Sequence, residues 1–140
     1  MKKILLAITV LATMAFSGDY KDGISELEKG YTKKGLTLMK KYFGKEEYAD
    51  GIFFLGLNYT EGTMGVKQNY SIALILFQES ADYGDRRALV MLGNAYDDGL
   101  GVEINKIKAY EYWKEAAKKG EPKAIGNLDR LCKNSPWACK

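Results

Sequence analysis

Two cysteines, Cys132 and Cys139, carry the most readily interpreted chemistry of this 140-residue chain. They are its only cysteines, and six residues separate them. In an oxidising compartment, an even and local pair of this kind indicates a disulfide. Closing so short a loop removes about 2–3 kcal/mol of unfolded-chain entropy on the loop-entropy account. Because the two-residue spacing of redox-active dithiols is missing, we predict a structural disulfide that staples the C-terminal tail.

Residues for hydrolytic catalysis are sparse. The chain has no histidine, which removes Ser-His-Asp and Cys-His catalysis and the usual His-based zinc hydrolase site. A serine β-lactamase needs a lysine three residues after its serine, and none of the five serines has one. Residues 30–35 have the glycine spacing of a P-loop, but Leu36 and Thr37 follow where Lys-Ser or Lys-Thr is required. We therefore predict no catalytic residue, no cofactor site and no metal site.

Paired carboxylates occur at positions 97–98 and 46–47. A calcium site or a general acid could use such a pair, but neither pair has the alternating Asp/Asn loop of an EF-hand. Solvated helix ends are the simpler interpretation.

An internal repeat supplies the elements that carry these residues. The segment LGLNYTEGTMGV, which starts at Leu55, returns as LGNAYDDGLGV, which starts at Leu92. The offset is 37 residues before the loop and 36 after it, because the first loop has one extra residue. A fixed period in this range is typical of a solenoid, in which each unit buries its apolar face against its neighbours.

Each repeat has the pattern of two helices. Apolar residues recur at three- and four-residue intervals, which predicts a first helix (A) over 47–60 and 86–97. The second helix (B) is predicted over 70–83 and 106–119. A third A helix starts at Lys123 without a B helix after it.

Particular side chains mark the helix ends and contacts. Asn69 and Asn105 precede the B helices, where a side-chain oxygen can cap the first free amides. Gly56 and Gly93 stand inside the A helices, where glycine costs about 1 kcal/mol relative to alanine. Their recurrence predicts that another helix passes too close for a Cβ atom.

The first residues indicate export. Lys2 and Lys3 precede an uncharged run over residues 4–16 and a small-residue exit, the pattern of a signal peptide. We expect cleavage before Gly18, with cleavage after Ala15 as the alternative. A run of 13 residues spans about 20 Å, short of the ~30 Å hydrocarbon core, so a membrane anchor is the weaker interpretation. The protein is expected in the periplasm or outside the cell.

The charge of the chain argues against nucleic acid. The net charge of +3 falls to +1 without residues 1–17, which carry two lysines and no acidic residue. Nucleic-acid binding needs a basic stripe that displaces counterions, and a nearly neutral domain offers none.

These observations predict an all-α protein, a right-handed α–α solenoid of about seven helices. The expected parts are a signal peptide (1–17), a divergent helical hairpin (18–46), repeat 1 (47–84), repeat 2 (85–121) and a C-terminal half-repeat with the stapled tail (122–140).

The motif that joins the two helices resembles the Sel1-like repeat, a relative of the tetratricopeptide repeat. Residues 88–120 match A-x-x-x-L-G-x-x-Y-x-x-G-x-G-V and the following N, A-x-x-x-F/W-x-x-x-A-x-x-G at nearly every position. Residues 51–84 match with Gly51 in the alanine place and one extra loop residue. The resemblance implies an adaptor or scaffold. One branch, the Helicobacter cysteine-rich proteins, is linked to β-lactamase activity and penicillin binding, but it has a cysteine pair in each repeat and this chain does not.

Our first hypothesis is an exported scaffold that binds a protein or peptide partner. The alternatives are a β-lactamase-like hydrolase or penicillin-binding protein, implied only by the resemblance, and an immunity or cell-envelope assembly adaptor. The faces of the A helices that are not needed for packing would bind the partner. The equivalent positions on that face are Phe54, Met91 and Asn127, and Leu57, Asn94 and Arg130.

Overall fold

The computed structural model describes residues 18–140, so the predicted signal peptide (1–17) lies outside the described residues. Those residues form six α-helices, one short 3-10 helix and no strand, which confirms the all-α prediction. The elements are α2 (Gly18–Glu28), α3 (Thr32–Glu61), α4 (Tyr70–Asp82), α5 (Arg86–Asp98), α6 (Lys106–Lys118), α7 (Pro122–Asn134) and the 3-10 helix η1 (Pro136–Cys139). They fall into two compact units, the first ending at Tyr48 and the second spanning Ala49–Lys140.

The first unit contains α2 and the first part of α3. Helix α2 packs against the first part of α3, and Tyr20, Leu27 and Met39 are buried. The rings of Tyr20 and Phe43 meet edge to face, with centroids 6.4 Å apart. Burial raises the pKa of Tyr20, because its phenolate would lose water.

Helix α3 changes direction at one glycine. The sequence predicted a hairpin over 18–46 and a separate helix beginning at residue 47, whereas α3 runs from Thr32 to Glu61 with only Gly44 outside the helical region. Gly44 has φ 72° and ψ 175°, a conformation that glycine adopts without a steric penalty. The predicted boundary is therefore marked only by a one-residue break, and the A helix of repeat 1 is the C-terminal part of α3.

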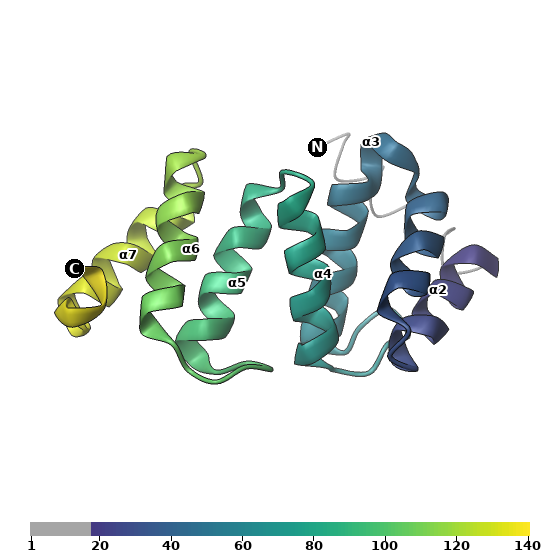
Figure 1. Cartoon of the computed structure of the whole chain (residues 1–140), viewed down its shortest axis with the longest axis horizontal. Coiled ribbons are helices and arrows are strands. Elements are labelled where there is room, and N and C mark those ends of the chain that lie inside the picture. Colours follow the sequence, from purple (N-terminus) through teal and green to yellow (C-terminus); the bar gives the residue numbers. More distant parts are fainter. Residues whose placement is uncertain (1–17) are drawn as a thin grey trace. The chain divides into compact units, whose positions relative to one another are not determined.

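The second unit contains the repeats. The helices α4, α5, α6 and α7 follow one another side by side, each packed on the next (Figure 1). Their interior is apolar, with Leu76, Leu92 and Trp113 among the most deeply buried side chains. Within residues 49–140 the chain is therefore a stack of helical hairpins, as the repeat predicted.

The ends of the B helices repeat in detail. Asn69 Oδ1 accepts a hydrogen bond from the Ile72 amide (3.1 Å), and Asn105 Oδ1 accepts one from the Lys108 amide (3.0 Å). Both asparagines are thus N-caps, as predicted. Their own amides donate to the carbonyl oxygens of Tyr59 and Tyr96, each at 2.8 Å. The loop between the A and B helices is fixed in the same way in both repeats.

The glycines inside the A helices face aromatic rings. A Cβ atom on Gly56 would lie 2.7 Å from the ring of Phe77, and one on Gly93 would lie 2.4 Å from the ring of Trp113. Both rings come from the B helix of the same repeat and are buried. The prediction of a close neighbour is confirmed, and the neighbour is a ring rather than a helix backbone.

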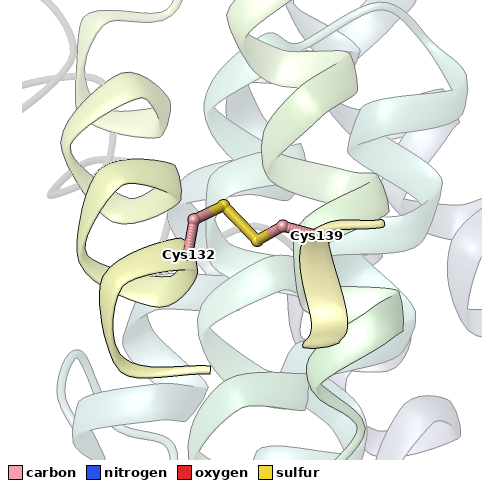
Figure 2. Close-up of a disulfide and its surroundings, with 2 residues drawn as sticks. All are labelled: Cys132 and Cys139. Atoms are coloured by element: carbon pink, nitrogen blue, oxygen red, sulfur yellow. A yellow bond between two sulfur atoms is a disulfide. The ribbon is translucent and has the colours of Figure 1, made fainter. Parts of the chain in front are cut away.

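The C-terminal tail folds back on the last helices. Cys132 on α7 and Cys139 on η1 form a disulfide across the end of the chain (Figure 2). The tail packs against both α6 and α7, and Ala138 is buried there. The disulfide thus holds η1 on the end of the repeat core.

Candidate functional site

The six residues predicted to bind a partner lie on the three A helices of the second unit. Phe54 and Leu57 are on α3, Met91 and Asn94 on α5, and Asn127 and Arg130 on α7. Arg130 is exposed and the other five are half-buried. We call the contact between repeat 1 and α5 the first junction, and the contact between repeat 2 and α7 the second junction.

At the second junction, Asn94 connects three helices. Its Oδ1 accepts a hydrogen bond from Nδ2 of Asn127 on α7 (3.0 Å) and one from Nε1 of Trp113 on α6 (3.2 Å). The same indole N–H also lies 3.2 Å from the carbonyl oxygen of Val90. The side-chain oxygen of Asn94 therefore pairs with both the amide of Asn127 and the indole N–H of the buried tryptophan, which is a structural role.

Asp97 is a second polar tie at this junction, and the sequence analysis missed it. The interpretation of residues 97–98 as solvated helix ends was wrong for Asp97, which is 4% exposed, although Asp98 is exposed. Lys106 Nζ lies 2.6 Å from Asp97 Oδ1, and Arg130 Nη2 lies 3.2 Å from Asp97 Oδ2. A buried carboxylate needs such partners, because desolvation of an unpaired charge is costly.

Arg130 therefore takes part in the contact between helices, although we predicted it on a face that packing does not need. Its guanidinium pairs with buried Asp97 and also lies over the ring of Trp113, 5.8 Å from the centroid. The spacing of 33 residues between Asp97 and Arg130, one repeat less one helical turn, is the signal that could have indicated this pair.

The first junction has the same register but different chemistry. One repeat back, the positions of the Asn94–Asn127 pair are occupied by Leu57 and Met91, and those of the Asp97–Arg130 pair by Thr60 and Asn94. The charged and amide pairs of the second junction are thus absent from the equivalent positions, which hold two apolar residues, Leu57 and Met91, and two uncharged polar ones, Thr60 and Asn94.

A small recess opens at this first junction. It provides about 30 Å³ of space for water-sized molecules and is almost wholly apolar in its accessible surface. It is lined by Thr60 on α3, by residues of α4 and α5, and by a loop residue: Tyr70, Ala73, Leu74, Phe77, Met91, Asn94, Ala95 and Leu100. Of the predicted face residues, the structure therefore brings Met91 and Asn94 into the recess and leaves Phe54 and Leu57 out of its lining.

Phe54 lies instead beneath an arginine of the next repeat. The guanidinium of Arg87 stands 4.3 Å from the ring centroid of Phe53 and 5.5 Å from that of Phe54. Arg87 also donates to Asp85 (3.0 Å from Nε) and to Asp50 of repeat 1. The hydrogen bond to Asp85 raises the pKa of Arg87 above its ordinary value, so the side chain keeps its positive charge. Arg87 therefore joins α5 to α3 at the first junction.

Residues 18–140 contain neither a cluster of metal-binding side chains nor a membrane-spanning helix. No group of three or more Asp, Glu, Cys or His side chains there is placed to hold a metal ion. Within the same residues, none of the helices combines the length and apolar character needed to cross a bilayer.

A family model of the Sel1 repeat matches residues 49–85 and 86–121, which is just over half of the chain. The chain belongs to the Sel1-repeat family. The matched residues cover repeats 1 and 2. In the structure, both repeats have a glycine packed against an aromatic ring and an asparagine that caps the B helix, and their helices stack on one another. Sel1-repeat proteins generally mediate protein–protein interaction.

Two comparisons extend this finding. The crystal structure of a Sel1 repeat protein from Oxalobacter formigenes matches with a TM-score of 0.60 and 28% identity, over 86% of this chain and 51% of that one. The chitin synthase regulator SKT5 of Saccharomyces cerevisiae is 28% identical over 104 residues, which are 74% of this chain and 15% of the regulator. The chain therefore spans about half of the first protein and a small part of the second.

Proposed function

We propose that this Sel1-repeat protein is an exported scaffold that binds a protein or peptide partner on the A-helix face, with the apolar recess of the first junction as its anchoring point. The observation that carries the proposal is the contrast between the two junctions. Equivalent positions hold the bonded polar pairs Asn94–Asn127 and Asp97–Arg130 at the second junction, whereas the first junction has neither pair at these positions and an apolar recess opens there.

Such a site suits the anchoring of one apolar side chain. With about 30 Å³, the recess accepts the tip of a side chain rather than a whole small-molecule substrate, since ligand pockets usually measure several hundred cubic ångströms. A few well-packed apolar anchors commonly supply most of the binding energy of an interface. Met91 lines the recess and is half-buried, and its flexible thioether adapts to the shape of a partner.

The surrounding structure pre-organises this site. Asn94 is held by Trp113 and Asn127, and Arg87 is held by carboxylates of both repeats. Side chains that are ordered before binding lose less conformational entropy on association. The relative in yeast is named as a regulator of an enzyme, and regulation by binding is a role that such a scaffold can perform.

The second part of the proposal is export. The basic residues and uncharged run of residues 1–17 support it, and the Cys132–Cys139 disulfide is chemically suited to an oxidising compartment. We expect the intact mass of the protein from the periplasm or medium to correspond to a start at Gly18 or Phe16, two hydrogen masses below the dithiol form. A full-length cytoplasmic species, or two thiols that react with an alkylating agent after denaturation, would contradict this.

Site-specific photo-crosslinking tests the binding face. A photoreactive amino acid at Met91 is expected to give a discrete crosslinked partner in the native cell, because this side chain lines the recess. The matched control places the same group at Ser71, which is exposed on α4 and outside the recess lining. Crosslinks of equal yield and identity at both positions, or none at Met91, would count against the proposed face.

A further inference from the structure

Helix α7 is an A helix that lacks a B helix of its own within residues 18–140. A comparison of equivalent positions on the three A helices shows which surface of α7 is exposed. Ile52 on α3, Leu89 on α5 and Ile125 on α7 are equivalent positions of the three A helices. The first two are 0% and 4% exposed, whereas Ile125 is 62% exposed. An apolar residue therefore stands uncovered at a position that both complete repeats bury.

The covering element in repeat 2 is known. Leu89 belongs to one buried cluster with Ala109, Trp113 and Ala116, all from α6. The B helix of the same repeat thus covers this position with a small–large–small stripe. The next position agrees: Phe53 and Val90 are buried in repeats 1 and 2, whereas a Cβ on the equivalent Gly126 would meet nothing within 4 Å.

The stapled tail covers a different part of α7 and leaves Ile125 exposed. Cys132 stands at the register of Tyr96, whose ring stacks on Tyr112 of α6 with centroids 5.7 Å apart. The disulfide holds η1 at this point of α7 (Figure 2). Ile125 lies seven residues, about two helical turns, nearer the start of α7 than Cys132.

Charge indicates the kind of helix that fits. Residues 106–140 carry nine basic and four acidic residues, a net charge of +5, whereas residues 49–105 carry three basic and eight acidic residues, a net charge of −5. Exposed lysines at positions 118, 119 and 123 surround the start of α7. Two copies of this face brought together would repel each other, so charge disfavours a symmetric dimer and favours an acidic partner.

We propose that the N-terminal half of α7 accepts a short, acidic amphipathic helix of a partner protein, seated as a B helix is seated in repeats 1 and 2. The inference rests on the proposed partner-binding function, but it uses a surface that does not include Met91. The recess of the first junction and the face around Ile125 are two separate contact surfaces.

A peptide based on α6 provides the probe. It has the sequence of residues 109–120, which contains the α6 residues that cover Leu89, with Lys114, Lys118 and Lys119 changed to glutamate. Binding of the fluorescently labelled peptide to the disulfide-bonded protein is measured by anisotropy. We expect saturable binding, at least tenfold tighter than that of the peptide with its three lysines, because the start of α7 is basic.

Two protein variants then locate the site. Ile125→Glu is expected to weaken the acidic peptide at least tenfold, since it removes an apolar contact and adds a like charge. Ile104→Glu, at an equally exposed isoleucine on the loop between α5 and α6, is the matched control and should leave binding unchanged. If Ile125→Glu fails to fold by circular dichroism, Ile125→Ala takes its place with the same direction of change.

Several results would overturn the inference. They are the absence of saturable binding by the acidic peptide, equal weakening by the two isoleucine variants, or a dimer of the protein alone that Ile125→Glu dissociates in sedimentation, which would assign the face to a second copy. Met91→Glu should leave peptide binding intact, so loss of the Met91 crosslink would count against the first surface and not against this one.

Discussion

Replacing Gly93 with leucine is expected to lower the free energy of unfolding by about 3 kcal/mol, at the upper end of the cost of overpacking a core. The first added atom would lie 2.4 Å from Nε1 and 2.5 Å from Cδ1 of Trp113. The ring cannot move aside easily, because it is fully buried and its N–H is held by Val90 and Asn94. Urea unfolding followed by circular dichroism measures the change.

The matched control is Gly126→Ala. Gly126 is also inside a helix, but a Cβ there would meet nothing within 4 Å. Alanine should therefore stabilise the protein by up to about 1 kcal/mol, through helix propensity alone. Gly93→Ala, which has the same propensity gain, should instead destabilise. If the two alanine variants change stability in the same direction, the packing of Gly93 against the ring is not the reason for its presence.

Removing the ring itself should have the larger effect. Trp113→Ala is expected to cost about 3–5 kcal/mol, the range measured for large-to-small changes at buried aromatic residues. Trp113 is fully buried at the centre of the α5–α6–α7 core. Its loss also deprives the Asn94 side chain of one hydrogen-bond donor.

The second tryptophan of the chain is the control for this variant. Trp137 on η1 is 60% exposed, so Trp137→Ala should change the free energy of unfolding by about 0.5 kcal/mol or less. Chemical denaturation of both variants in the oxidised state measures the difference. Similar losses in the two proteins would mean that the ring of Trp113 does not organise the repeat core.

Much of this fold follows from local signals in the chain. The B helices begin at Lys106 and Tyr70 because Asn105 and Asn69 cap them, and these asparagines are visible in the repeat. The recurring glycine and aromatic residue, Gly56 with Phe77 and Gly93 with Trp113, are also visible there. Such features recur in each repeat, so one sequence contains its own comparison.

The contacts that differ between repeats were not predictable in the same way. Asp97 has no charged equivalent in repeat 1, where Thr60 takes its place, and its neighbour Asp98 is exposed. Its burial depends on Lys106 and Arg130, which come from two other helices. A side chain whose state is set by long-range partners leaves little trace in local periodicity.

The candidate site was predicted in part for the same reason. Register placed Met91 and Asn94 on the A-helix face, and both line the recess. Register alone could not show that Asn94 is held by Trp113 and Asn127, or that Phe54 lies under Arg87. The six positions, which are two sets of three equivalent residues, therefore have different roles. Met91 is the one that lines the recess and has no polar tie to another repeat.

The most direct test of the proposed function pairs a thermal melt with a binding measurement for Met91→Glu, using the partner that crosslinking at Met91 identifies. A glutamate beside the apolar recess should weaken the partner at least tenfold, because its charge must be desolvated without a counter-ion. Ile104→Glu is the control, and Met91→Gln tests the loss of apolar contact without charge. The account predicts a folded Met91→Glu variant with lost binding. A folded Met91→Glu variant that binds the partner at wild-type affinity would contradict it.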